Sequence, residues 1–332
     1  MPEIVVATPI SNFGISKPYA FSDGISIRKL PNILWATAIT KGFLSDNEWA
    51  YLSEPHFWLC ASKDVENVDT DEVGDGLFNK GRYAALALQI LCPSGGKHVF
   101  FKFKKTNDGY DNVESEHFKE LCSTLPGRIA SLEEQGLQEH FDAVYAGVKR
   151  AFAEKVVRLQ NPVLLIEHGM QIGNPNLGAL MFVMALDMLF MAGGADAFMT
   201  RVGGFFNTNE LLFMPDSLHQ QPNTVVRSVL QELYKFRNII AHGQEIPEEP
   251  YLKEYELIGM KGERINHDPY YYNQFLNDSG LFILTASLRR IFVDSLFDEV
   301  KNKARWGAKM TAYEHRYKDS EGKTVTAKCG RR

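Results

Sequence analysis

Arg237 and His242, with four residues between them, are the side chains in this sequence that most strongly suggest chemistry. They lie in the segment Leu233–Gly243, LYKFRNIIAHG. His242 falls at the end of a predicted helix, where the helix dipole favours the protonated imidazolium and therefore a role as general acid. Arg237 falls at the edge of the apolar stripe of that helix. Its charge there needs a partner or a solvated cleft, because an unpaired buried charge is costly. Asn238 precedes His242 by four residues and shares its helix face.

Asp187 is the acidic residue that best complements Arg237, because it is the one charged residue in the most apolar segment of the chain, Leu177–Ala195. A structural ion pair between the two is one interpretation. The other is that Asp187 supports a functional site by aiming the guanidinium. Either way we expect the two side chains within ion-pair reach, and Asp187→Ala to cost far more than a surface change, about 3–5 kcal/mol for a buried pair. Arg289 or Arg290 is the alternative partner.

Helix geometry sets a difficulty for a site built from one helix. Five steps along a regular helix rotate a side chain by about 140°, so Arg237 and His242 do not share a face. Either the long arginine side chain reaches round, or the site forms between helices or between two subunits. The sequence leaves both arrangements open.

The elements that must position these residues are helices, predicted by apolar residues at three-four spacing from residue 137 onward. The predicted helices span Leu137–Arg158, Asn176–Met191, Thr224–His242 and Gly280–Asn302. The second is apolar on nearly every side, so we expect it at the centre of a bundle, with Asn176 as its N-cap. Asn223 is the expected cap of the third, and Gly243 is placed to end it. Tyr270–Tyr272, which follow Asp268-Pro269, are predicted to lie in a long loop.

Residues 1–125 are predicted to form a β-rich domain, because short aliphatic and aromatic runs alternate with Gly, Pro, Asn and Asp clusters. The expected strands are Ile25–Leu30, Ile33–Thr40, Phe57–Ala61, Tyr83–Cys92 and His98–Lys104. A chain of 332 residues with 45% hydrophobic and 23% charged residues is typical of a globular protein with two domains. The predicted fold class is α+β: this domain, a helical bundle at 137–302 and a basic tail at 303–332.

The C-terminal tail is strongly basic although the chain as a whole has a net charge of -5. From Lys301 to Arg332 there are ten Lys and Arg residues against three Asp and Glu. Trp306 interleaves with Arg305, Lys309 and Arg316, a pattern that can stack on single-stranded RNA and neutralise its backbone. The alternative is a frayed, solvated tail.

Other patterns argue against membrane, secreted and metal-dependent proteins. Asp187 interrupts the apolar segment, and an acid at the centre of a membrane span costs about 2.5–3.5 kcal/mol, which favours a buried core helix. The start of the chain has no signal-peptide pattern, so we expect a cytoplasmic protein. The four cysteines lack paired spacing and Glu167-His168 is not part of an HExxH motif, so no metal or cofactor is expected. The sequence contains no Gly-x-Ser-x-Gly motif, which argues against a hydrolase with a serine nucleophile.

The motif Arg237-Asn238-x-x-x-His242, followed by Gly243, resembles the signature of the HEPN superfamily, an Arg and a His separated by four to six residues. Among such proteins the sequence is most similar to the Apea-like HEPN group of bacterial proteins. The supporting segments are ALDMLF at Ala185–Phe190, LRRIF at Leu288–Phe292 and GISIRKL at Gly24–Leu30. The helical resemblance covers about residues 137–300, and the β-rich half matches only weakly.

This resemblance implies a metal-independent endoribonuclease that acts as a homodimer, with two motifs lining a shared cleft. It implies Arg237, His242 and Asn238 as catalytic residues, supported by Asp187. A 2′-hydroxyl would attack the adjacent phosphate, the histidine would move protons, and the arginine would stabilise charge on the phosphate oxygens. The products would carry 2′,3′-cyclic phosphate ends. A role in bacterial growth inhibition or defence against phage is the expected context.

Two alternatives follow from the same sequence. The first is a non-catalytic RNA-binding or scaffold dimer of the same fold. The second is a ligand-sensing regulator, in which the β-rich half binds a ligand, a phage component or a regulatory partner and the helical half only dimerises.

Overall fold

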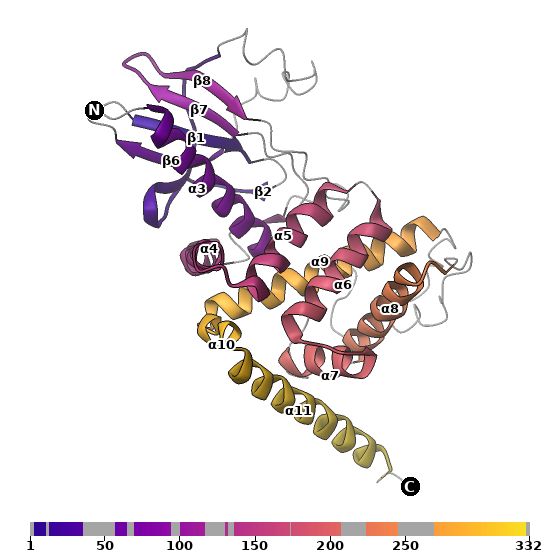
Figure 1. Cartoon of the computed structure of the whole chain (residues 1–332). Helices are drawn as coiled ribbons and strands as arrows, with labels where there is room; N and C mark the ends of the chain where they lie inside the picture. The colour runs from indigo at the N-terminus through magenta and orange to yellow at the C-terminus, as the bar shows by residue number, and fades with distance from the viewer. Residues whose placement is uncertain are drawn as a thin grey trace. The chain divides into compact units, whose positions relative to one another are not determined.

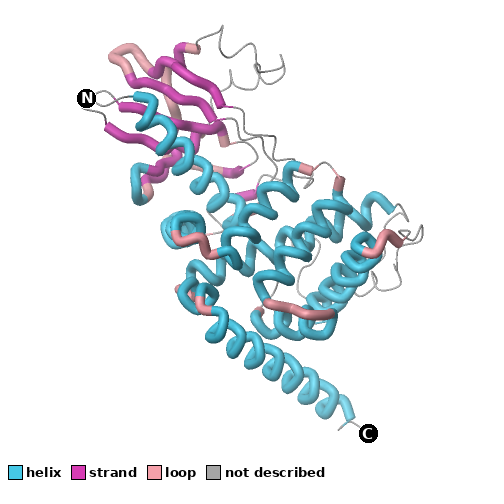
Figure 2. The backbone as a smooth tube through the Cα atoms, viewed as in Figure 1, coloured by secondary structure: helices cyan, strands magenta, loops and turns pink. Residues whose placement is uncertain are grey.

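The computed structural model of the chain describes residues 3–10, 13–35, 57–64, 70–93, 100–116, 130–131, 136–172, 174–206, 224–244 and 269–329. It is a mixed α+β protein, as predicted, and strands and helices are distinguished along the backbone in Figure 2. The chain divides into two compact units, Met1–Ala153 and Glu154–Arg332. Residues 36–40 of the predicted strand Ile33–Thr40, residues 98–99 of the predicted strand His98–Lys104, and the predicted N-cap Asn223 lie outside the described residues.

The first unit contains a mixed sheet of seven strands within the described residues. In sequence order they are β1 (Glu3–Pro9), β3 (Tyr19–Ala20), β4 (Ile25–Arg28), β5 (Ile33–Leu34), β6 (Trp58–Asp64), β7 (Phe100–Lys105) and β8 (Tyr110–Glu116). Their order across the sheet is β3-β4-β6-β1-β7-β8-β5, and only the β5–β8 pairing is parallel. A separate parallel pair joins β2 (Phe13–Gly14) to β9 (Ala130–Ser131).

Strand β1 is central, and side chains on both of its faces are buried. On one face Val6 lies close to Gly81 of helix α3 (Thr70–Leu91), which packs across the sheet (Figure 1). On the other face Val5 and Ala7 belong to an aromatic-rich core cluster. Its other buried members are Leu30, Trp58, Cys60, Phe101, Phe103 and Tyr110. Because consecutive strand residues point to opposite faces, a strand that is buried on both faces has a continuous run of apolar residues in its sequence.

The strand predicted at Tyr83–Cys92 is wrong, because this segment forms the C-terminal part of α3. Its sequence, YAALALQILC, is a continuous apolar run whose periodicity does not distinguish a buried strand from a buried helix. The alanines and leucines that fill it favour helix. The helix is buried along much of this run, so no polar face reveals its period.

Helix α4 (Leu137–Ala153) lies in the first compact unit, whereas the sequence grouped it with the C-terminal helices. The single helix predicted over Leu137–Arg158 is interrupted before α5 (Val157–Gln171). Lys155 at the break has a φ of +51°, a left-handed conformation that a continuous helix does not contain.

The second unit is built around α6 (Pro175–Phe190), which packs against its neighbours α5, α7, α8 and α9. Those not yet delimited are α7 (Ala195–Phe205), α8 (Thr224–Ala241), α9 (Pro269–Val293), α10 (Phe297–Lys301) and α11 (Lys303–Cys329). The central place predicted for the apolar helix is therefore confirmed. Its N-cap is Asn174 rather than Asn176: Asn174 Oδ1 accepts the backbone N–H of Asn176 at 2.9 Å. Pro175 fits the first helical position because it has no N–H to leave unsatisfied.

Among the later helices, α8 ends where the sequence predicted, whereas the bounds of α9 differ from the prediction. Helix α8 ends as predicted, and Gly243 has the left-handed φ of +63° expected of a residue that terminates a helix. Helix α9 begins at Pro269, so Tyr270–Tyr272 lie in its first turns and not in a loop. The helix expected to reach Asn302 ends at Val293, and Ser295 has a φ of +57° at the break. Within the described residues the basic tail forms helix α11, in contrast to the alternative of a frayed tail.

No single helix within the described residues is both long and apolar enough to cross a membrane. Helices α6 and α7 reach that apolar length only as a pair, and the pair is bent by 76°.

Candidate functional site

The guanidinium of Arg237, near the end of α8, is contacted by three side chains. Its Nε lies 3.7 Å from Asp187 Oδ2 on α6, which is an ion pair too long for a hydrogen bond. Its Nη1 donates a hydrogen bond to Asn238 Oδ1 at 2.9 Å. Its Cζ lies 5.5 Å from the centre of the Tyr234 ring. The predicted proximity of Asp187 and Arg237 is confirmed, whereas their part in catalysis stays a prediction.

The pair is half-buried, with 15% of the Asp187 side chain and 30% of the Arg237 side chain exposed. Burial raises the pKa of Asp187 to about 6, and the attraction of Arg237 opposes this only in part. Asp187 Oδ1 is buried, and no described residue donates a hydrogen bond to it, which explains the dominance of desolvation. The alternative partner Arg290 instead donates a hydrogen bond to the Phe205 carbonyl oxygen at 2.7 Å.

His242 follows the last residue of α8 and its side chain is exposed. Its backbone N–H donates to the Asn238 carbonyl oxygen at 3.0 Å, which continues the helical pattern through the histidine. Asn238 thus contacts Arg237 through its side chain and His242 through its backbone. Within the described part of the chain the imidazole has no hydrogen bond or ion pair, so it is accessible for proton transfer.

Of the four side chains predicted to bind RNA in the basic tail, fewer are available at the surface than the sequence suggested. Trp306 is fully buried, and its indole N–H donates to a backbone carbonyl of α6 at 2.6 Å, so the predicted stacking on a base is wrong. Lys309 forms an ion pair with Glu299. Arg305 and Arg316 are exposed, and Arg316 lies over the ring of Tyr313 at 5.5 Å. The amphipathic helix places its aromatic residues inward and these two arginines outward.

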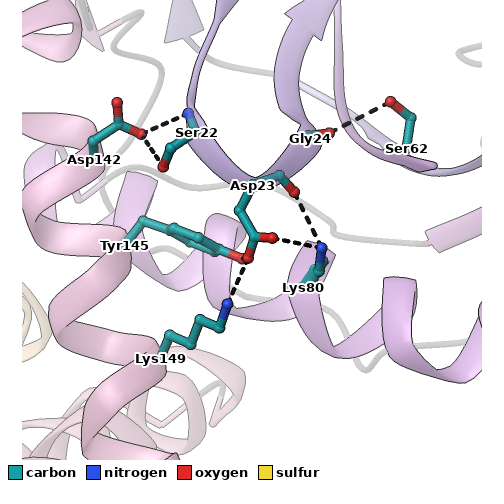
Figure 3. A network of polar contacts seen from close by, with 8 residues as sticks. All are labelled: Ser22, Asp23, Gly24, Ser62, Lys80, Asp142, Tyr145 and Lys149. Atoms are coloured by element: carbon teal, nitrogen blue, oxygen red, sulfur yellow. Dashed lines mark hydrogen bonds and ion pairs between the residues drawn. The ribbon is translucent and has the colours of Figure 1, made fainter.

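A second polar cluster, which the sequence analysis did not identify, surrounds Asp23 in the first unit (Figure 3). The Asp23 carboxylate accepts hydrogen bonds from Lys80 Nζ and Lys149 Nζ, each at 2.6 Å, and from the Tyr145 hydroxyl at 2.9 Å. Asp23 lies in the turn between β3 and β4 and has a φ of +59°. Asp is among the few residues that tolerate this left-handed conformation.

These contacts fix the β3–β4 turn to two helices. Lys80 belongs to α3, and Lys149 and Tyr145 belong to α4. Ser22, beside Asp23, donates its backbone N–H and its hydroxyl to Asp142 Oδ1 on α4, at 2.9 and 2.7 Å. Burial alone would raise the pKa of Asp23, but the hydrogen bonds from Lys149, Lys80 and Tyr145 outweigh it and lower the pKa to about 2. Since Lys80, Lys149 and Tyr145 already donate their hydrogen bonds to Asp23, we interpret the cluster as structural.

Asp23→Ala should reduce the free energy of unfolding by about 1–2 kcal/mol at neutral pH, because three hydrogen bonds to a partly exposed carboxylate are lost. The pKa of Asp23 is lower in the folded than in the unfolded chain, so the stabilisation is present above about pH 4 and is lost as the pH falls towards 2. Urea unfolding at pH 7 and pH 3 measures this, with the exposed Asp108→Ala as control. Equal stability of the two variants at pH 7 would contradict the interpretation.

No protein-family model, curated protein or solved structure matches this chain. Within the described residues, no group of three or more His, Cys, Asp or Glu side chains is placed to hold a metal ion. The candidate site consists of Asp187, Arg237, Asn238 and His242. Its function is therefore inferred from the chemistry of these four side chains.

Proposed function

We propose that the chain is a metal-independent endoribonuclease whose active residues are Arg237 and His242, assisted by Asn238. The observation that supports this best is the held guanidinium of Arg237, contacted by Asp187 and Asn238 and followed by an exposed histidine at the helix end. A cation fixed in this way can stabilise developing negative charge without rearranging during the reaction. The exposed imidazole can reach a substrate proton.

The proposed reaction is an internal transfer at one RNA phosphate. The 2′-hydroxyl oxygen forms a bond to phosphorus while the bond to the 5′-oxygen of the next nucleotide breaks. The 2′-hydroxyl loses a proton and the leaving 5′-oxygen gains one, and His242 serves one of these transfers. Arg237 hydrogen-bonds the phosphate oxygens on which charge builds. The products are a 2′,3′-cyclic phosphate and a 5′-hydroxyl, and no water is consumed.

The proposal includes a HEPN-like arrangement of the helical unit and a homodimer. Arg237 and His242 point in directions about 140° apart on a regular helix, so two copies about a two-fold axis would supply complementary pairs to one phosphate. The interface should include the C-terminal part of α8 and bury at least about 1,200 Å² in total. Solution mass at micromolar concentration tests this: a strict monomer that cleaves RNA would contradict the shared site.

Cleavage should persist in EDTA, because Arg237 and not a metal ion handles the phosphate charge. The measurement is the rate of cleavage of total RNA by the purified chain with EDTA and with added magnesium. We expect similar rates in both. Activity that disappears in EDTA and returns with magnesium would contradict the mechanism.

The rival functions are outcomes of the same assay. RNA that is bound but not cleaved would favour the non-catalytic RNA-binding dimer. Neither binding nor cleavage would favour a regulator whose first unit senses a ligand or partner. The proposed role in growth inhibition or phage defence requires that the cleavage be toxic to a bacterial host.

A further inference from the structure

Tyr234 lies three residues before Arg237 on α8, so the two side chains are neighbours on the helix surface. The Arg237 Cζ is 5.5 Å from the centre of the Tyr234 ring, within the range of a cation–π contact. Tyr234 is only 8% exposed. Its ring centre lies 5.2 Å from that of Phe198 on α7, at an angle of 45° between the planes. The ring is therefore a fixed surface and not a mobile neighbour.

The three contacts to the Arg237 guanidinium constrain different parts of it. Asp187 attracts the Nε edge, Asn238 accepts from Nη1, and the Tyr234 ring lies against the group. Among the described residues, Nη2 has no hydrogen-bonded partner. Two polar contacts in the plane of the guanidinium leave this planar group free to tilt about the line that joins them, whereas an aromatic surface resists tilting.

We infer that Tyr234 is a positioning residue of the candidate site, which holds the Arg237 guanidinium so that Nη2 is directed to a phosphate oxygen. This inference rests on the proposed function for its consequence in catalysis, but not for the positioning itself. The Phe198 ring on α7 packs against Tyr234 but is not among the contacts of the guanidinium, so Phe198 offers a control that separates helix packing from the ring contact with Arg237.

The kinetic test compares Tyr234→Leu, which removes the aromatic surface, with Tyr234→Phe, which keeps it. Under multiple-turnover conditions we expect Tyr234→Leu to lower the cleavage rate about tenfold, within the range of a cation–π contact. The loss should fall on kcat with KM nearly unchanged, because orientation matters most in the transition state. Tyr234→Phe should stay within about twofold of the wild-type rate. Equal losses in both variants would overturn the inference.

Phe198→Leu is the matched control for packing, because it disturbs the same aromatic pair while leaving the Tyr234 ring beneath Arg237. Its unfolding free energy, measured beside that of Tyr234→Leu, corrects for lost stability. If Phe198→Leu lowers kcat as much as Tyr234→Leu at equal folded fraction, packing and not the ring contact explains the effect, and the inference fails.

A second readout needs no activity. In protein labelled with ¹⁵N-arginine, the Nε–H signal of Arg237 is assigned by its absence in Arg237→Lys. We expect its exchange with solvent to be at least about fivefold faster in Tyr234→Leu than in wild type or Tyr234→Phe, because the covering ring is gone. Unchanged exchange would overturn the positioning role. If wild-type protein cleaves no RNA, the proposed function fails, and this measurement still decides the role of Tyr234.

Discussion

Replacing His242 with alanine should lower the rate of RNA cleavage by about 10²–10⁴-fold, the usual contribution of a positioned general acid or base. The imidazole is exposed at the end of α8 and forms no hydrogen bond or ion pair with another described residue, so the substitution should change the unfolding free energy by no more than about 0.5 kcal/mol. Single-turnover cleavage and urea unfolding measure the two effects. A large loss of rate without loss of stability is the signature of a residue that acts on substrate.

The matched control for His242 is His315, another exposed histidine, on α11. His315→Ala should cleave at the wild-type rate. In a bacterial host, His242→Ala should express with less growth inhibition than wild type, whereas His315→Ala should inhibit growth fully. Equal inhibition by wild type and His242→Ala would show that any toxicity is unrelated to cleavage and would favour the scaffold function.

Replacing Asp187 with asparagine should separate stability from activity. Burial raises the pKa of Asp187 to about 6, so the ionised carboxylate destabilises the fold at neutral pH relative to a neutral group. We therefore expect Asp187→Asn to be at least as stable as wild type at pH 7.5. Cleavage should nevertheless fall about tenfold, because Arg237 loses the charge that aims it.

The pH dependence of stability gives the sign of this effect. The folded-state pKa of Asp187 lies above its unfolded value of about 4, so the folded chain binds the proton more tightly. Wild-type stability should fall, relative to Asp187→Asn, as the pH rises from about 4 to about 6. The difference should be roughly 1–2 kcal/mol, because solvent screens the partly exposed pair. Parallel stability curves for the two proteins would contradict the raised pKa.

The same geometry revises the expected cost of Asp187→Ala. A fully buried ion pair loses about 3–5 kcal/mol when one partner is removed. Since 30% of the Arg237 side chain is exposed and water can solvate it, the loss should be smaller here. It should still exceed that of Asp294→Ala, whose carboxylate pairs with Arg290 at the surface, 49% exposed, because alanine, unlike asparagine, also leaves a space where the mostly buried Asp187 side chain packed.

Local signals predicted the elements that carry the candidate site. The apolar spacing of α8 and the glycine after it predicted where that helix ends, because capping depends on adjacent residues. The isolated charge of Asp187 in an apolar helix predicted its proximity to Arg237, because a buried charge requires a partner. The burial of Trp306 was not predicted, because the sequence of a basic segment with interleaved aromatic residues fits both a solvated tail and a helix that buries one face.

Long-range contacts escaped the sequence analysis. The Asp23 cluster joins a turn to Lys80 and Lys149, which lie 57 and 126 positions away in the chain. Nothing in the spacing of these residues indicates that they meet. The contacts of Tyr234 with Arg237 and with Phe198 on α7 were not predicted either, because an aromatic residue in an amphipathic helix by itself suggests only packing.

The most direct test of the central claim is the chemistry of the RNA ends made in EDTA by wild-type protein and by the double variant Arg237→Ala/His242→Ala. Mass spectrometry of the fragments should find 2′,3′-cyclic phosphate and 5′-hydroxyl ends with wild type and no cleavage with the double variant. Fragments formed equally by both proteins, or no fragments from wild type, would contradict the assignment of Arg237 and His242 as the residues of a metal-independent ribonuclease.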